Sequence, residues 1–193
     1  CKHKSVLGSS YTQKGRSGFR GKGSCLLHRK GEKQMQPLEL YIHIPFCVKK
    51  CAYCDFLSGP AGEKEKEEYV KMLVDEIRNC PDTVQNYRVI SIFFGGGTPS
   101  LLTGEQIGRL MDTVREIFTL DEDAEITMEM NPGTVTEEKL RKYRQAGVNR
   151  LSIGLQSVND EELRLLGRIH TYEEFREAYH LARVNGFSNI NVD

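Results

Sequence analysis

Short apolar runs alternate with amphipathic stretches from residue 40 to residue 193. The runs are rich in Ile, Val, Leu and Phe and are too short for helices, which predicts β-strands. They lie at residues 40–44, 89–94, 125–130, 150–155 and 189–193. Between them, apolar residues recur at the spacing of one helix face and predict helices. These lie at residues 63–79, 103–117, 136–147, 159–167 and 171–186.

The predicted helices have recognisable ends. Thr103 is followed three residues later by Gln106, and Thr171 by Glu174, so each pair can form a capping box at a helix start. Gly147 follows the third predicted helix, and a glycine in the left-handed conformation commonly ends a helix. These start and stop signals support the alternation of strands and helices.

Strands that alternate with helices form βα units, and such units build a parallel sheet, so the fold class is α/β. The five predicted units make most of a barrel. A closed or nearly closed barrel needs at least one more, so we expect the chain to be truncated after the fifth strand. A doubly wound sheet is the main alternative. Only the order of the strands separates the two folds.

The formal net charge of zero hides a division of the chain. Residues 1–38 carry nine Lys or Arg and one acid, Glu32, whereas the rest of the chain carries 18 basic and 26 acidic side chains. This Gly-rich and Ser-rich segment has almost no periodic apolar residues, so it cannot bury enough surface to offset the entropy lost on folding. We therefore expect residues 1–38 to be a disordered basic head and residues 39–193 to be the folded part.

The composition narrows the possible partners. A hydrophobic content of 38% and a charged content of 28% fit a globular protein without a membrane span. Basic tails can bind the phosphates of nucleic acids, but this one has few interleaved aromatic residues. We expect neither a membrane nor a nucleic acid as a partner.

Three cysteines, Cys47, Cys51 and Cys54, have the spacing C-x3-C-x2-C. One loop with this spacing can wrap a single inorganic group, and we expect an iron–sulfur cluster. Such clusters usually take four thiolates, so three would leave one iron open to substrate. A structural zinc site with His43 as the fourth ligand is an alternative. A redox pair of Cys51 and Cys54 would leave Cys47 unexplained.

Flexible or polar residues follow the predicted strands. The segment Gly-Gly-Gly-Thr-Pro at residues 95–99 follows the second strand, and its glycines let the backbone approach a ligand closely. Glu129 ends the third strand between two methionines, where an unpaired carboxylate is costly to bury. Gln156 ends the fourth strand and can both donate and accept hydrogen bonds. In a parallel barrel these strand ends meet at the face where chemistry takes place.

The cysteine motif, with the aromatic Tyr53 before its last cysteine, resembles the signature of the radical S-adenosylmethionine superfamily. The preceding Tyr-Ile-His-Ile-Pro-Phe, at residues 41–46, is similar to that of the oxygen-independent coproporphyrinogen III oxidase family. The resemblance covers residues 40–193. It implies a partial parallel (β/α)6 barrel of the TIM type, of which this chain would be the N-terminal part.

The resemblance also implies a cofactor site. Cys47, Cys51 and Cys54 would hold a [4Fe–4S] cluster, and its open iron would chelate S-adenosylmethionine. An electron passed through the cluster would cleave the sulfonium to give a 5′-deoxyadenosyl radical. Backbone N–H groups of the Gly-Gly-Thr segment would receive the carboxylate of the cofactor. The positions that match the family's cofactor contacts are Tyr41, Gly96, Gly97, Thr98, Glu129, Gln156, Arg168 and Asp193.

One departure from the family's pattern separates its two branches. The porphyrinogen-decarboxylating enzymes carry a further Cys two residues after the third ligand, where this sequence has Phe56. The departure matches the heme-chaperone branch, which favours binding of heme and its transfer to an acceptor protein. Oxidative decarboxylation of coproporphyrinogen III is the alternative. A zinc-stabilised barrel that binds a ligand without radical chemistry is a further one.

Either branch implies heme or a porphyrinogen as the ligand, and an electron donor for the cluster. An exposed cluster loop reacts with oxygen, and the cysteines show no disulfide pattern, so we expect the protein in the reducing cytoplasm.

Overall fold

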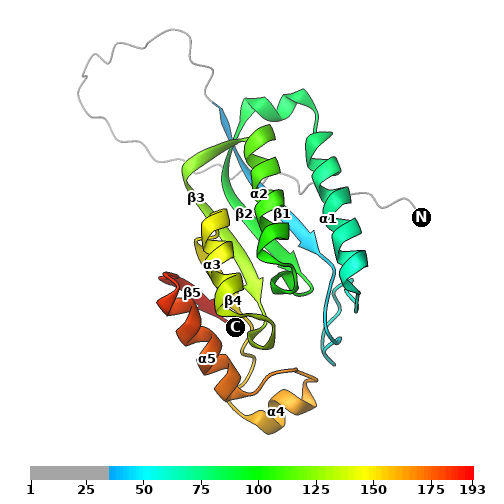
Figure 1. The fold of residues 1–193 in the computed structure, drawn as a ribbon, viewed down its shortest axis with the longest axis vertical. Coiled ribbons are helices and arrows are strands. Elements are labelled where there is room, and N and C mark those ends of the chain that lie inside the picture. The colour runs from blue at the N-terminus through cyan, green and yellow to red at the C-terminus, as the bar shows by residue number, and fades with distance from the viewer. Residues whose placement is uncertain (1–34) are drawn as a thin grey trace, which may run out of the picture. The chain divides into compact units, whose positions relative to one another are not determined.

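A computed structural model describes residues 35–193 of the chain. They form a five-stranded parallel sheet with helices packed on it (Figure 1). The strands are β1 (Gln36–Ile44), β2 (Tyr87–Gly96), β3 (Thr119–Met130), β4 (Arg150–Ile153) and β5 (Asn189–Val192). The helices are α1 (Glu63–Arg78), α2 (Gly104–Ile117), α3 (Glu137–Ala146), α4 (Asp160–Leu165) and α5 (Tyr172–Val184). Short 3-10 turns are η1 (Asp82–Asn86), η2 (Pro99–Leu101) and η3 (Pro132–Thr134).

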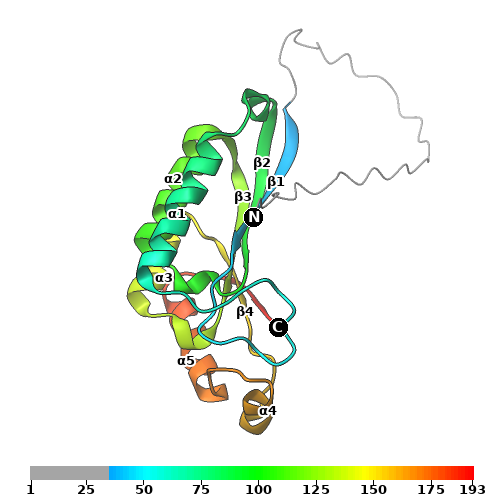
Figure 2. The same ribbon diagram turned by 90° about the vertical axis from the view of Figure 1, so that its right-hand side faces the viewer.

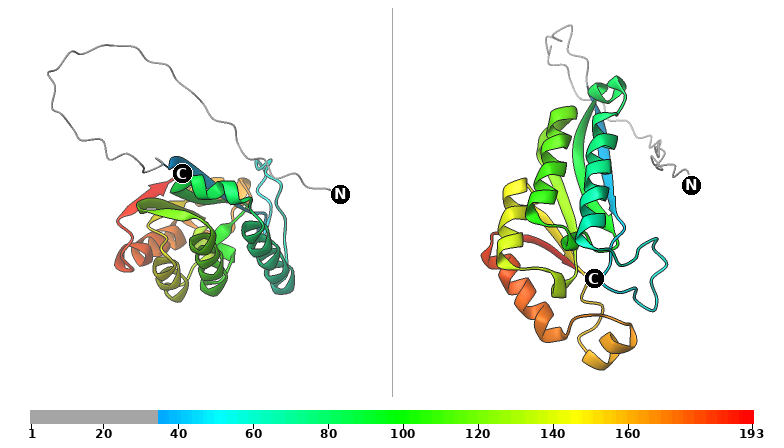
Figure 3. Two further views of the ribbon diagram at one scale, coloured as in Figure 1. Left: turned by 90° about the horizontal axis from the view of Figure 1, so that it is seen from above. Right: turned by 45° about the vertical axis from the view of Figure 1, so that its right-hand side comes forward.

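The strand order is that of a barrel. Each strand pairs with its neighbours in the sequence, in the order β1-β2-β3-β4-β5, and the described sheet is open rather than closed. A doubly wound sheet would reverse this order at a switch point, so that alternative is wrong. The helices α1, α2, α3 and α5 cover one face of the sheet (Figures 2 and 3). The α/β partial barrel is thus confirmed as an open arc of five parallel strands with their connecting helices.

The hydrophobic core lies between the sheet and these helices. One side chain from almost every strand is fully or nearly fully buried there, namely Ile44, Phe94, Met128 and Leu151, packed in a single cluster with residues of α2 and α3. Alternate residues of a strand point to opposite faces, so the intervening residues lie on the face without helices. The strand side chains that face the helices are therefore apolar, and those that face the barrel interior are mostly polar.

Two strands begin at least four residues earlier than predicted. β1 begins at Gln36, so residues 36–38 belong to the strand and not to the head, and β3 begins at Thr119 rather than at residue 125. Both extensions continue the parallel pairing with β2, in which Gln36 lies opposite Tyr87. Backbone pairing depends little on side-chain pattern, which explains why periodicity underestimated these strands. The predicted disorder of residues 1–34 lies outside the described residues.

The predicted helix ends are confirmed. The side chains of Thr103 and Thr171 accept hydrogen bonds from the N–H groups of Gln106 and Glu174, each at 3.2 Å. Both complete the reciprocal capping box. Gly147 has φ 105° and ends α3 in the left-handed conformation.

Within residues 35–193, no helix combines the length and the apolar character needed to cross a bilayer.

Candidate functional site

A cavity of about 280 Å³ opens where the strands end, beside the loop that carries the cysteines. Every predicted site residue lines it except Tyr41. These are Cys47, Cys51, Cys54, Gly96, Gly97, Thr98, Glu129, Gln156, Arg168 and Asp193. The other lining residues are Val48, Lys49, Tyr53, Phe56, Met130, Asn131, Ser152, Gly154 and Ile169. The carboxyl edge of the sheet thus gathers residues that are far apart in the sequence.

The cysteine loop, residues 45–59, leaves β1 and returns to the same point before α1. Its ends are joined by two backbone hydrogen bonds, from Cys47 N to Gly59 O at 2.9 Å and from Gly59 N to Pro45 O at 3.0 Å. The loop projects beyond the end of the sheet, on the side where α4 lies (Figure 2). Because its ends are joined, this short loop carries all three thiols within one closed segment of the chain.

The thiols of this loop are free and have polar neighbours. The thiol of Cys47 donates to the Oγ of Ser58 at 3.4 Å, and the Oγ1 of Thr98 donates to the Cys47 Sγ at 3.7 Å. The Nη1 of Arg168 donates to the Cys51 Sγ at 3.7 Å. Hydrogen-bond donors thus lie next to two of the three sulfurs.

The described side chains form no preassembled single-metal site, which applies to the three thiols alone as well as to a zinc site with His43. Between residues 35 and 193, no three His, Cys, Asp or Glu side chains converge closely enough to hold a single metal ion. His43 does not line the cavity; its ring contacts Tyr41 Oη at 3.4 Å and Leu57 O at 3.5 Å. Cys80 follows α1, where its thiol donates to Glu76 O, and it also lies outside the cavity lining.

The backbone N–H groups of the glycine segment are already bonded within the protein. Gly97 N donates to Ile44 O at 2.8 Å, and Thr98 N donates to Phe46 O at 2.7 Å. Gly96 N donates to the carboxylate of Glu129 at 3.0 Å. The expectation that these N–H groups are free to receive a ligand's carboxylate is therefore wrong for this structure.

The glycines serve a different purpose, which is close packing against β1 and its exit. A Cβ on Gly97 would lie 2.5 Å from the carbonyl oxygen of Phe46. Gly96 has φ 115°, and a Cβ there would lie 2.5 Å from the ring of His43. Side chains at these positions would push the cysteine loop away from β2, so the glycines hold the two segments together.

Glu129 is the most buried carboxylate among the cavity residues. Burial raises the pKa of its carboxyl group, and the charge of Asp193 raises it further. The Gly96 N–H and His43 act in the opposite direction. A carboxylate held near a second one attracts cations, because a bound positive charge relieves both the repulsion and the loss of hydration.

Asp193 belongs to a polar network at the ends of β4 and β5. Ser152 donates to Asp193 Oδ2 at 2.9 Å, and Asn191 donates to Asp193 Oδ1 at 2.6 Å. Gln156 N donates to Asp193 O at 2.7 Å. Gln156 has φ 71°, which is rare for a residue other than glycine, so the surroundings hold it in a strained conformation at the cavity wall.

Arg168 lies in the connection between α4 and α5. Its Nη2 donates to Gly154 O at 2.7 Å, and its Nη1 lies 3.5 Å from the hydroxyl of Tyr53. The Nε is buried and has no hydrogen-bond partner among the described residues. An unpaired buried donor is costly, and Arg168 remains in the cavity wall despite that cost.

Tyr41 is the predicted site residue that the structure leaves outside the cavity. Its side chain is 58% exposed and stacks against Phe93 with ring centroids 6.0 Å apart. Partial burial and the charge of Glu129 raise the pKa of its hydroxyl. Tyr41 therefore lies near the cavity, on the face of the sheet without helices, but does not contribute to its wall.

Ser152, Asn131 and Gly154 were assigned no role from the sequence, although all three line the cavity. Ser152 interrupts an otherwise apolar strand between Leu151 and Ile153, which is a detectable signal of a polar interior face. Asn131 and Gly154 directly follow strands, and only the three-dimensional fold identifies them.

The donor set fits an iron–sulfur cluster with a charged organic cofactor beside it. Three thiols share one loop and one cavity wall, and Arg168 and Thr98 direct donors at their sulfurs. Two carboxylates and one guanidinium line the same cavity. Such a mixture matches a ligand that carries both positive and negative groups.

Known proteins are similar to this chain in sequence. The family model described as the radical SAM superfamily matches residues 41–193. The Heme chaperone HemW of Escherichia coli is 48% identical over 161 residues, which is 83% of this chain and 43% of that protein. The mitochondrial Radical S-adenosyl methionine domain-containing protein 1 of Danio rerio is 36% identical over 154 residues, 80% of this chain and 35% of that protein. The chain thus spans less than half the length of these curated relatives.

Solved structures agree with the fold. The structure titled coproporphyrinogen III oxidase (HemN) from Escherichia coli, a radical SAM enzyme, has a TM-score of 0.76 and 37% identity. It covers 83% of this chain and 37% of its own. Native anSMEcpe with bound AdoMet shares the fold with a TM-score of 0.54 at 16% identity, covering 80% of this chain and 43% of its own. The family match over most of the chain, together with the shared fold, establishes that this chain belongs to the radical SAM superfamily.

Proposed function

We propose that Cys47, Cys51 and Cys54 hold a [4Fe–4S] cluster and that the adjoining cavity binds S-adenosylmethionine. We further propose that the whole protein binds heme and transfers it to an acceptor protein. The observation that carries the first part is the cavity itself. The three thiols, Glu129 and Arg168 line one cavity although they come from three separate parts of the chain.

The charges of the cavity support S-adenosylmethionine as the ligand. This cofactor carries a sulfonium, an ammonium and a carboxylate. Glu129 and Asp193 supply negative charge for the two cations, and Arg168 supplies a planar donor for the carboxylate. Gln156 adds an amide that can pair with the nucleoside.

The role of this chain is to bind and orient. Bound together, the cluster and S-adenosylmethionine supply one-electron chemistry that amino acid side chains cannot. Three protein thiolates would leave one iron of the cluster without a protein ligand, and the cavity beside the cysteine loop would hold the organic cofactor next to it. The half-buried carboxylate of Glu129, held by the Gly96 N–H, and the amide of Gln156 give the cavity a polar wall.

Heme binding is favoured over porphyrinogen decarboxylation by Phe56. This residue stands where the decarboxylating branch is expected to carry a further Cys, and its side chain lines the cavity while remaining 61% exposed. The relative at 48% identity is named a heme chaperone. The structural neighbour at 37% identity is named a coproporphyrinogen III oxidase, so decarboxylation is the second candidate. Either activity needs an electron donor and a reducing compartment such as the cytoplasm.

The cluster is tested by anaerobic reconstitution of this chain. We expect about four irons and four sulfides per chain and a broad visible absorbance. The Cys47→Ala, Cys51→Ala, Cys54→Ala triple variant should lose both, whereas Cys80→Ala should keep them because Cys80 lies outside the cavity. Equal iron and sulfide in the triple variant would refute the proposal. About one zinc and no sulfide in the parent would favour the zinc-stabilised barrel.

The choice between the two activities requires the whole protein with a reduced cluster and S-adenosylmethionine. Incubation with coproporphyrinogen III and separate titration with heme should give stoichiometric heme uptake and no release of carbon dioxide. Robust formation of protoporphyrinogen IX would overturn the chaperone proposal in favour of decarboxylation.

A further inference from the structure

Besides its contacts with Thr98 and His43, the cysteine loop is held at two further places. At its neck, the Cys47–Gly59 and Gly59–Pro45 hydrogen bonds tie its two ends together. At its far side, between the second and third cysteines, it contacts the α4–α5 connection. That second contact joins segments that are more than a hundred residues apart.

The second contact has three parts that act on adjacent residues. Ala52 N donates a backbone hydrogen bond to Leu166 O at 3.0 Å. Gly167 lies directly against the loop, because a Cβ on it would be 3.5 Å from Ala52 N and 3.7 Å from Cys51 Cα. Its φ of 76° belongs to the left-handed region, which glycine adopts without strain.

Arg168 supplies the third part. Its Nη1 reaches both the Cys51 Sγ at 3.7 Å and the hydroxyl of Tyr53 at 3.5 Å, while its Nη2 is fixed on Gly154 O at 2.7 Å. The guanidinium therefore joins the end of β4 to two residues of the cysteine loop. A planar group with several donors suits acceptors that lie in separate segments of the chain.

We propose that residues 166–168 form a clamp that holds the cysteine loop in shape, and that Arg168 positions Cys51 as a cluster ligand before S-adenosylmethionine binds. This inference rests on the proposed cluster and extends it, because it gives Arg168 a role that needs no organic cofactor. A contact with S-adenosylmethionine alone would leave the cluster unaffected in the absence of that cofactor.

Two variants test the clamp. Each has a matched control that makes the same kind of change away from the cysteine loop. Arg168→Gln removes the guanidinium, and Arg164→Gln removes another one from an exposed position on the neighbouring helix. Gly167→Ala introduces a methyl group against the loop. Gly186→Ala introduces the same strain at φ 86° after α5, where the nearest described atom is the Arg144 Nε at 3.9 Å.

The first readout needs no cluster. Hydrogen exchange of the cluster-free chain should be several-fold faster at Ala52 in Gly167→Ala and Arg168→Gln, because the hydrogen bond to Leu166 O is loosened. The two controls should exchange like the parent. Unchanged exchange at Ala52 in both clamp variants would overturn the proposal, whether or not the chain holds a cluster.

The second readout uses cluster-loaded protein without S-adenosylmethionine. Loss of a positive donor beside a ligand sulfur disfavours the reduced cluster, so the midpoint potential of Arg168→Gln should shift to more negative values. Release of iron to a chelator should be several-fold faster in both clamp variants than in both controls. A potential and an iron-release rate equal to those of the parent would refute the positioning of Cys51.

A parent without any cluster would refute the proposed function instead, and hydrogen exchange would still test the clamp. If Arg168→Gln fails to fold, Gly167→Ala decides the test, because it deletes no interacting group.

Discussion

The two faces of the sheet contrast in what they bury. Toward the helices, Phe94 and Leu151 are completely buried in a continuous apolar cluster. On the opposite face, Glu129 of β3 and Ser152 of β4, next to Leu151, line a polar cavity together with Asp193, which follows β5. Because neighbouring residues in a strand serve opposite faces, one short run of sequence encodes both stability and binding.

The contrast predicts that truncating one phenylalanine strongly lowers the free energy of unfolding, whereas truncating another hardly changes it. Phe94→Ala should lower the free energy of unfolding by about 3–5 kcal/mol, because it opens a cavity in a packed core. Phe56→Ala, in the cysteine loop, should change it by less than about 0.5 kcal/mol, because the side chain is 61% exposed. Urea unfolding of the cluster-free chain measures both values. Equal losses would mean that the cysteine loop packs as firmly as the core.

The sequence could predict the helix-covered face well, because its signals are local. Periodicity located all five strands and helices, and Thr103 and Gly147 marked helix ends where the structure has them. Strand length was less predictable. The start of β3 at Thr119 depends on pairing with β2 and not on its own residue pattern.

Most of the predicted site residues do line the cavity, but their hydrogen bonds could not be predicted from the sequence. Family resemblance identified Glu129 and Arg168, yet the bonds of the Gly97 and Thr98 N–H groups to β1 and its exit were not foreseeable. The positive φ of Gln156 was equally hidden, since nothing in an isolated glutamine signals that conformation. These features arise where distant segments meet, which single-sequence patterns do not report.

A second comparison tests whether the position of a carboxylate on the interior face decides its role. Glu129 and Glu125 lie on the same face of β3, but only Glu129 lines the cavity. Glu129→Gln should weaken S-adenosylmethionine binding about tenfold, or ~1.4 kcal/mol, because the amide keeps the size of the side chain but loses its charge. Glu125→Gln should leave the affinity unchanged, since Glu125 pairs with Arg150 at 3.7 Å instead. Equilibrium dialysis of cluster-loaded protein measures both. An equal loss in the two variants would indicate a general field effect and not a specific contact.

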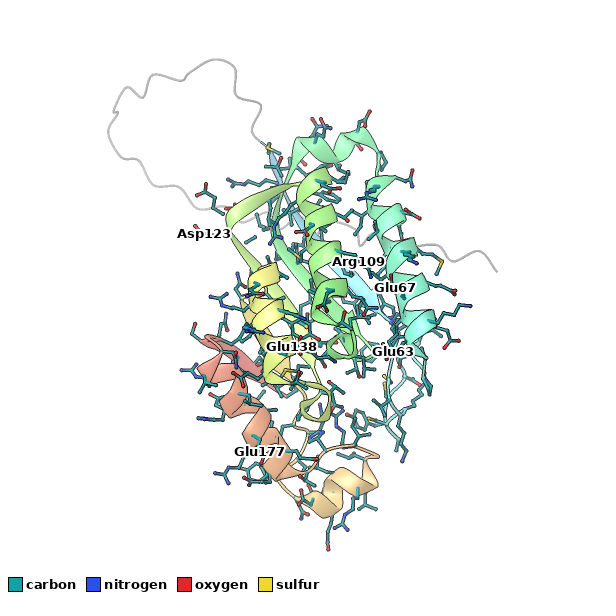
Figure 4. The ribbon with its side chains drawn as sticks, in the orientation of Figure 1. Glu63, Glu67, Arg109, Asp123, Glu138 and Glu177 are labelled. Atoms are coloured by element: carbon teal, nitrogen blue, oxygen red, sulfur yellow. The ribbon has the colours of Figure 1, made fainter. Side chains whose placement is uncertain are left out.

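The smallest expected effect is the dependence of stability on pH. One carboxylate from each region contributes to it, and the pKa values of the two are shifted in opposite directions. Glu67 lies on α1 opposite Arg109 of α2, in the outer helical layer (Figure 4). Hydrogen bonds from Arg109 and Gln106 lower the pKa of Glu67 to about 2. Burial, assisted by Asp193, raises the pKa of Glu129. One region therefore favours its charged carboxylate and the other disfavours it.

These shifts predict opposite slopes of stability against pH. Because the pKa of Glu67 is lowered on folding, its contribution is present above the unfolded value near 4.5 and is lost as the pH falls toward 2. Because the pKa of Glu129 is raised, the folded state holds an extra proton between the unfolded and folded values, and stability falls as the pH rises through that window. The urea midpoint of the cluster-free chain, measured against pH, reports this stability. In Glu67→Gln the midpoint should fall less at acid pH than in the parent, and in Glu129→Gln it should fall less as the pH rises. Added salt should diminish the first effect more, because the Glu67 pair is partly exposed whereas Glu129 is more deeply buried. Slopes of the same sign for both carboxylates would contradict the division of the molecule into a stabilising outer layer and a strained polar cavity.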